Sequence, residues 1–237
     1  MVDILAFGVH PDDIELGVGG TLIKHIKMGS KVGLVDLTNG EMGTRGDAKT
    51  REIEAKNACS IIGAEFRINL NMEDGFVSVN KKNIMEVVKV IRAYRPKLVL
   101  CNAIKDRHPD HAIASELVSK ACFNSGLSKI SSSFENENQV HHRPHAVYHY
   151  IQDRWIDPDF VVDISDVFVD KIKAVKAYKS QFYNPDSKEP VTPISSKEFL
   201  HSIEAKAQLL GRSVKVKYGE GFTTESTVGI NNLFNII

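Results

Sequence analysis

The sequence predicts an α/β fold in which helices cover both faces of a doubly wound, mostly parallel sheet. Three observations predict it. Apolar runs of strand length alternate with segments of helical periodicity through the first half of the chain. Glycine and proline stand where several of these segments are expected to begin or end. The 237 residues, 42% hydrophobic and 25% charged, are enough for one large globular domain.

Four strand–helix units are expected in the first half of the chain. The expected strands are residues 4–9, 31–37, 67–70 and 97–102, and the expected helices are 14–28, 48–62, 83–91 and 109–123. Gly63 closes the second helix because glycine accepts the left-handed conformation of a helix end. Pro96 ends the third helix and Pro109 opens the fourth, since proline disfavours helix before it but suits a first turn. Four such units in series are typical of a Rossmann-like sheet.

The second half of the chain is less regular. Strands are expected over 146–151 and 160–164, and helices over 167–182 and 196–210. The polar segment 125–144 is expected to be a mobile loop, and Pro185, Pro190 and Pro193 mark another loop. No repeat or linker interrupts the chain, so residues 1–237 are interpreted as a single domain with an irregular C-terminal part.

Charge and cysteine content exclude several classes of protein. Thirty Lys and Arg residues balance thirty Asp and Glu residues, so no overall field attracts nucleic acid or a membrane surface. Cys59, Cys101 and Cys122 are widely spaced in apolar segments and are expected to be reduced, as in a cytoplasmic protein. The N-terminus lacks a basic region, and no apolar run reaches the roughly 18 residues of a membrane helix. Binding must therefore depend on a local site.

Two similar polar clusters mark the expected site. The first, residues 10–13 with the sequence HPDD, follows the first strand, and the second, residues 108–111 with the sequence HPDH, follows the fourth strand. In a sheet of order 3-2-1-4 these two strands are neighbours whose crossovers leave in opposite directions. The crevice above such a pair is where ligands bind. The fold is therefore expected to bring the clusters together.

The residue types in these clusters suit metal-dependent hydrolysis. His10, Asp13 and His111 offer the nitrogen and oxygen ligands of a catalytic zinc, which keeps a fourth position open for water. Asp12 is then the candidate base, and His108 the candidate acid and oxyanion donor on the opposite side of the substrate. Asp110 is placed to orient one of the imidazoles.

Other interpretations of the same residues were weighed. The acids could be helix N-caps, but capping does not explain two His-Pro-Asp clusters at one crevice. His10, Asp12 and His111 also fit the facial triad of a non-haem iron enzyme, which usually lies on a jelly roll, and Fe²⁺ or Co²⁺ also suits such ligands. The glycines of 17–20 lack the spacing of a nucleotide-binding loop. A non-catalytic binding module would not need a base beside an open metal position.

The remaining histidines and aromatic residues are interpreted as structural. His141, His142, His145 and His149 lie in or after the polar loop without a carboxylate at ligand spacing, so they are expected at the surface. The aromatic residues around Trp155 are expected to pack in the core and at its rim, with the wall of a sugar pocket as the alternative.

The paired clusters resemble the two signature motifs of the PIG-L (LmbE-like) family of zinc-dependent N-deacetylases. The likeness covers nearly the whole chain. Five further stretches resemble the bacterial branch that deacetylates N-acetylglucosaminyl malate in bacillithiol biosynthesis: 39–48 (NGEMGTRGDA), 51–55 (REIEA), 106–112 (DRHPDHA), 178–182 (YKSQF) and 218–222 (YGEGF). The tail 223–237 departs from that branch.

The resemblance implies one Zn²⁺ per chain on His10, Asp13 and His111, with Asp12 as general base. It implies that His108 stabilises the tetrahedral intermediate and protonates the leaving amine, with Asp110 as its hydrogen-bonded partner. The implied partners are a small amino-sugar substrate and further copies of the chain, with a hexamer as the candidate homo-oligomer.

The resemblance also suggests a substrate. An N-acetylglucosaminyl malate substrate would need cationic donors for its carboxylates, and the candidates are Arg45, Arg51 and Arg107. The alternative is another N-acetylglucosamine-containing substrate, such as a chitin oligosaccharide. That substrate would instead need aromatic and hydroxyl contacts.

Overall fold

A seven-stranded sheet forms the centre of the molecule. The computed structural model describes residues 1–237 except the side chain of Asn235. The strands, in spatial order, are β3 (Phe66–Met72), β2 (Val32–Thr38), β1 (Ile4–Gly8), β4 (Leu98–Cys101), β7 (Ala146–Tyr150), β9 (Gly219–Thr224) and β8 (Phe160–Asp163). The first five are parallel, and β9 runs antiparallel to both of its neighbours. The expected order 3-2-1-4 is confirmed and is extended by three strands.

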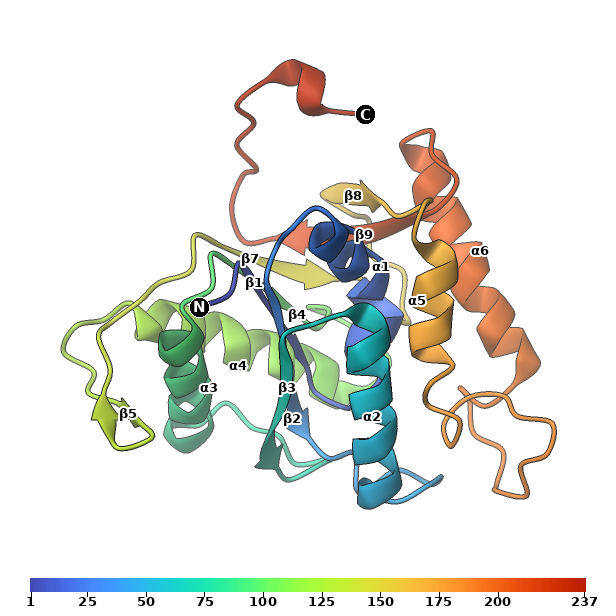
Figure 1. Cartoon of the computed structure of the whole chain (residues 1–237), viewed down its shortest axis with the longest axis horizontal. Coiled ribbons are helices and arrows are strands. Elements are labelled where there is room, and N and C mark those ends of the chain that lie inside the picture. Colours follow the sequence, from blue (N-terminus) through green and yellow to red (C-terminus); the bar gives the residue numbers. More distant parts are fainter.

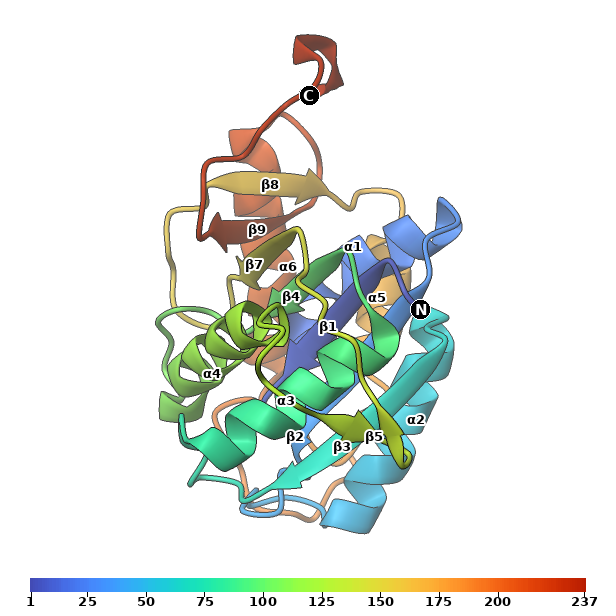
Figure 2. The same ribbon diagram turned by 90° about the vertical axis from the view of Figure 1, so that its left-hand side faces the viewer.

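Helices cover both faces of this sheet, as predicted (Figures 1 and 2). One face carries α3 (Lys81–Tyr94) and α4 (Pro109–Ser125), and the other carries α1 (Asp13–Lys27), α2 (Ala48–Ile62) and α5 (Phe168–Val175). Helix α6 (Lys197–Ser213) packs on β9. A C-terminal segment ending in the short helix η1 (Leu233–Asn235) projects away from the body. Among the described helices, none is long and apolar enough to cross a membrane.

The helix ends in the first half follow the predicted signals. Gly63 has a φ of 85°, and its N–H bonds to the carbonyl of Cys59 at the end of α2. Arg95, directly before Pro96, ends α3 with a φ of 48°. Pro109 is the first residue of α4. The four predicted strand–helix units are therefore confirmed, with boundaries that shift by a few residues.

The second half differs from the prediction in several elements. The helix expected over 167–182 ends at Val175, and turns then place Tyr178 and Phe182 in an apolar cluster with residues of α2. Strand β9 was not predicted, because glycine is uncommon in strands. Gly221 packs closely there, since a Cβ would lie 3.0 Å from the terminal methyl groups of both Ile151 and Leu210.

The polar segment 125–144 is not one unstructured loop. It contains a hairpin of β5 (Ser133–Phe134) and β6 (Glu137–Asn138). The buried guanidinium of Arg92 donates to the carbonyls of Ser125, Leu127 and Ile130 at 3.0, 2.9 and 2.7 Å. These bonds hold the segment against α3.

Two glycines of α1 explain how closely this helix packs. A Cβ at Gly17 would lie 2.2 Å from the ring of Tyr150, and a Cβ at Gly20 would lie 2.8 Å from Ile164. Tyr150 is fully buried and donates from its hydroxyl to the carbonyl of Phe7 at 2.7 Å, so its ring is not free to move. Close packing of helix on sheet therefore explains these glycines.

The same helix offers a matched pair of substitutions. Gly17→Ala should lower the free energy of unfolding by ~1–3 kcal/mol, because the added methyl group overpacks against the ring of Tyr150. At Gly19 the nearest atoms to a Cβ lie at 3.7 Å, an ordinary contact, so Gly19→Ala should be neutral or stabilise by up to about 1 kcal/mol. Urea unfolding of both variants measures the difference. Equal effects would contradict this account.

Candidate metal and catalytic site

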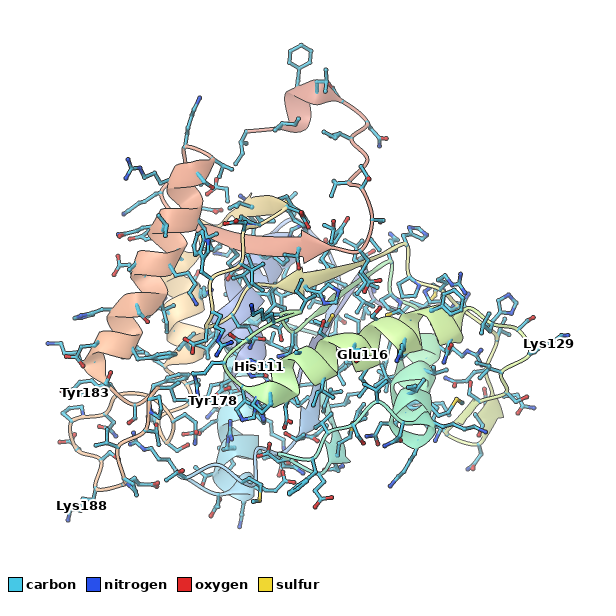
Figure 3. All side chains as sticks on the ribbon, turned by 180° about the vertical axis from the view of Figure 1, so that it is seen from behind. His111, Glu116, Lys129, Tyr178, Tyr183 and Lys188 are labelled. Atoms are coloured by element: carbon cyan, nitrogen blue, oxygen red, sulfur yellow. The ribbon has the colours of Figure 1, made fainter. Side chains whose placement is uncertain are left out.

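The two polar clusters meet in one cavity of about 250 Å³. The cavity opens where β1 and β4 end, and its lining includes His10, Asp12, Asp13, His108 and His111. Figure 3 shows His111 near the beginning of α4, with Glu116 farther along the same helix. The structure thus brings together, from the two ends of adjacent parallel strands, five of the residues selected from the sequence.

The first cluster forms a tight turn between β1 and α1. The N–H of His10 donates to Asp13 Oδ2 at 2.9 Å, and the N–H of Asp13 donates to the carbonyl of His10 at 3.3 Å. Asp12, at the N-cap position, has a φ of 112° and makes no side-chain cap. Such a backbone costs of order 1–3 kcal/mol in a non-glycine residue, and it leaves the Asp12 carboxylate in the cavity. Helix capping therefore does not account for Asp12.

The donor atoms of the expected ligands lie close together. Asp13 Oδ1 is 3.1 Å from His111 Nε2, and Asp13 Oδ2 is 3.6 Å from His10 Nδ1. All three residues are buried. Two imidazole nitrogens and a carboxylate suit Zn²⁺, and they also suit Fe²⁺ or Co²⁺. Among the described residues, the sets whose ligand atoms all lie within 4.8 Å of one another are His10 with His108 and His111, and His10 with Asp74 and Asp110. Asp13 contacts two of these histidines, but through different oxygens.

Side chains that the sequence did not single out hold these donors in place. Asn102 Nδ2 donates to Asp13 Oδ2 at 3.0 Å, and Gln152 Nε2 donates to Asp13 Oδ1 at 2.9 Å. Asp106 Oδ2 lies 2.5 Å from His111 Nδ1, which directs Nε2 toward the cavity. A carboxylate behind a histidine is the usual support of a metal ligand, so the residues fit a metal. The only sequence signal was position: Asn102 and Gln152 each lie just past a buried strand.

The ionisation of the cluster matches a cation site. Burial opposes protonation of His111, but Asp13 and Asp106 outweigh it and raise the pKa of His111 to about 9. The pKa of His10 is likewise raised well above its usual value, because its hydrogen bonds to Asp110, Asp13 and Asp74 outweigh burial. In the metal-free protein these imidazoles therefore hold protons that a divalent metal would displace.

Asp12, in the turn between β1 and α1, forms an ion pair with Arg51 of α2. Burial raises the pKa of the Asp12 carboxyl to about 7, although the charge of Arg51 acts in the other direction. Arg51 Nη2 lies 3.3 Å from Asp12 Oδ2 and donates to the carbonyl of Pro11 at 2.7 Å, while Nη1 donates to the carbonyl of Gly40 at 2.9 Å. Arg51 lines the cavity, but both of its terminal nitrogens are bound to the protein itself.

His108 lines the cavity and is hydrogen-bonded to Asp110, but through the backbone of that residue and not through its carboxylate. His108 is the N-cap of α4, and its Nδ1 accepts from the backbone N–H of Asp110 at 3.3 Å. The Asp110 carboxylate instead accepts from Gly75 N–H at 2.9 Å and lies 3.8 Å from His10 Nε2. The reason is local: Pro109 starts the helix, so the next residue presents its N–H to the cap while its side chain turns to the loop after β3.

The other two expected substrate-binding arginines are also bound to the protein. Arg45 is buried, does not line the cavity and donates from Nη2 to Ser187 Oγ at 2.5 Å. Arg107 lies at the rim, with 47% of its side chain exposed, and its Nε donates to Asp153 at 2.7 Å. Neither guanidinium is therefore directed into the cavity without a partner in the protein.

One expected surface histidine is not at the surface. His149, in β7, is buried, with Nδ1 2.8 Å from Ser115 Oγ and Nε2 3.0 Å from Glu225 Oε1. The prediction grouped it with the histidines in or after the polar loop, although it lies within the expected strand 146–151, whose alternation turns it inward.

Comparison with known proteins identifies close relatives by sequence. The matching family model is described as PIG-L, GlcNAc-PI de-N-acetylase, and it matches residues 5–122. The diacetylchitobiose deacetylase of Thermococcus kodakarensis is 33% identical over 189 residues, which span 76% of this chain and 70% of that protein.

Two solved structures share the fold over nearly the whole chain. A conserved protein of Thermus thermophilus is 33% identical, with a TM-score of 0.86 over 98% of this chain and 99% of its own. The 4-carboxy-2-hydroxymuconate hydratase of Pseudomonas putida is 21% identical, with a TM-score of 0.80 over 98% of this chain and 100% of its own. Because that relative is a hydratase, the fold alone does not determine the reaction.

Asp106 offers a test of the metal site that does not alter a ligand. Asp106→Asn should weaken zinc affinity by about 10–100-fold, because the amide orients and polarises His111 less well than the carboxylate does. Asp153→Asn, at the exposed rim, should leave zinc affinity unchanged. Competition with a chromogenic chelator measures both. Equal zinc affinity in Asp106→Asn and wild type would remove this support role.

Proposed function

The chain belongs to the PIG-L family of de-N-acetylases and is an amidohydrolase, and from this premise we propose that it deacetylates the N-acetylglucosamine unit of a small, neutral saccharide of the chitin-oligosaccharide type. One observation carries the proposal. His10, Asp13 and His111 converge in the cavity, with Asp12 and His108 beside them. The Thermococcus relative named for diacetylchitobiose supports the saccharide class.

The alternative substrate, an N-acetylglucosaminyl malate, is less well supported. Its two carboxylates would need free cationic donors, and the three candidate arginines already bind groups of the protein. The cavity lining also includes two carboxylates, those of Asp74, which is buried, and of Asp153, at the exposed rim. A neutral sugar avoids repulsion from these groups, and its hydroxyls are suitable donors to them.

His10, Asp13 and His111 are the residues that would hold the metal, which we propose to be Zn²⁺. When bound there, such an ion supplies Lewis-acid polarisation of the acetamido carbonyl and acidifies a water molecule. The supporting hydrogen bonds fit this role. The amides of Asn102 and Gln152 hold Asp13, and the carboxylate of Asp106 holds His111, so these metal-binding side chains are fixed before a metal binds.

The chain's own residues then move the protons. Asp12 takes a proton from the attacking water, and its pKa of about 7 suits a base that works near neutrality. Burial and the neighbouring charges of His10 and His111 lower the pKa of His108, so its imidazole is neutral. Because Nδ1 of His108 accepts the Asp110 N–H, its proton lies on Nε2 and can be donated to the developing oxyanion.

Two substitutions separate these roles from metal binding. Asp12→Asn should retain bound zinc and lower kcat by about 10²–10⁴, since it removes the base without removing a ligand. His108→Ala should also retain zinc and lower kcat by on the order of 10². Metal analysis accompanies each rate measurement. Loss of zinc from Asp12→Asn would instead place Asp12 among the ligands, as in the facial triad of a non-haem iron enzyme.

The substrate class is tested by comparing kcat/KM for three compounds: N,N′-diacetylchitobiose, N-acetylglucosaminyl malate and the methyl glycoside of N-acetylglucosamine. We expect diacetylchitobiose to exceed the malate conjugate by about 10-fold or more, equivalent to ~1.4 kcal/mol. A preference for the malate conjugate that disappears in Arg107→Ala would establish the alternative. Absence of turnover with all three in zinc-loaded protein would refute the N-acetylglucosamine assignment.

A further inference from the structure

The cavity has two ends of different chemistry. Its mouth is rimmed by exposed, mostly polar groups that include Met42, Arg107, Asp153 and Ser202. Its inner end lies between α1, α6 and β9 and is lined by buried, mostly apolar residues: Gly17, Ile151, Ile203, Ala207, Leu210 and Gly221. The loop that carries Tyr183 and Lys188 leads into α6, which forms one wall of this inner end (Figure 3).

The charged groups at the inner end are already paired. Lys171 Nζ lies 2.5 Å from Glu220 Oε1 and donates to the carbonyl of Leu16 at 2.9 Å. Glu220 also accepts from the backbone N–H groups of Gly20 and Thr21 at 2.9 and 2.7 Å. What this end offers to a ligand is therefore hydrocarbon surface, which favours an apolar group and disfavours sugar hydroxyls.

The direction of the cavity decides which part of the substrate meets this surface. Asp13 begins α1, and Gly17 lies one turn farther along the same face of the helix, roughly 6 Å away, among the buried residues of the inner end. In a trans amide the acyl chain and the nitrogen substituent lie on opposite sides of the C–N bond. A sugar at the polar mouth, with its amide carbonyl at the ligand cluster, therefore directs the acyl group inward.

We propose that the inner end of the cavity is an acyl-chain subsite, and that the enzyme hydrolyses N-acyl glucosaminides whose unbranched acyl chains are longer than acetyl. The inference rests on the proposed amide hydrolysis at this site. The reaction is the same: water adds its hydroxyl to the acyl carbon, the C–N bond breaks, the amine takes the proton, and a longer carboxylate leaves. The whole cavity, about 250 Å³, exceeds the roughly 150 Å³ of an apolar cavity that accommodates benzene.

The test is a chain-length series on one sugar. Methyl glycosides of N-acetyl-, N-butyryl- and N-hexanoyl-glucosamine are compared with zinc-loaded wild-type protein, and kcat/KM is measured by release of the free amine. We expect kcat/KM to rise by up to about fourfold for each buried methylene, at least as far as butyryl. Turnover of the acetyl compound with a steep fall at butyryl would overturn the subsite and leave the proposed function intact. No turnover of any of the three would overturn both.

A matched pair of substitutions on α6 tests whether the acyl chain lies at the inner end of the cavity. Ala207 is buried at the inner end, whereas Ala205, two residues earlier, is exposed. Ala207→Leu should lower the ratio of hexanoyl to acetyl kcat/KM by 10-fold or more, and Ala205→Leu should keep the wild-type ratio. An unchanged ratio in Ala207→Leu would overturn the proposal.

Product inhibition of the wild type supplies a second measurement that needs no variant. Hexanoate should inhibit more strongly than acetate, and its affinity should rise by up to about fourfold for each buried methylene. Equal inhibition by the two carboxylates would contradict an apolar subsite.

Discussion

The site depends on the carboxylate of Asp13. This buried anion faces His10 on its own turn and His111 from the second cluster, and it accepts amide hydrogens from Asn102 and Gln152. These partners follow β1, β4 and β7, three neighbouring parallel strands. A carboxylate out of water must be fully paired, so the strand ends are held at one spacing as long as Asp13 remains charged. The candidate metal position is thus determined before a metal binds.

The buried charges around Asp13 lower the stability of the fold, and apolar packing elsewhere in the molecule offsets this loss. Asp12 has a strained backbone and a raised pKa, and His10 lies between several carboxylates. Extensive apolar clusters on both faces of the sheet supply the opposing stabilisation. Strain and unfavourable ionisation that persist in an otherwise well-packed protein are typical of a functional site. The same reasoning explains why Arg51 is used to hold the Asp12 turn and not left free for a ligand.

The choice of substrate depends on which groups of the cavity have no partner within the protein. The arginines near the site are engaged by Ser187, by backbone carbonyls and by Asp153, so the cavity offers few free cations for an anionic group. It does offer carboxylates at the mouth and hydrocarbon within. In the function proposed above, that division would separate the recognition of a sugar from the recognition of its acyl group. A hydratase with the same fold illustrates that the architecture alone does not determine the reaction.

The sequence by itself determined the strand–helix alternation, the order of the central strands and the meeting of residues 10–13 with residues 108–111, because hydrophobic periodicity and strand adjacency are local and repetitive signals. It did not determine β9, whose glycines conceal a strand, or the supporting roles of Asn102, Gln152 and Asp106, since single polar residues carry no periodic pattern. It also did not show that the Asp110 carboxylate accepts from Gly75 or that Arg45 donates to Ser187. Only the tertiary structure decided these points, because the direction of a side chain depends on partners from other elements, and those partners are distant in the chain.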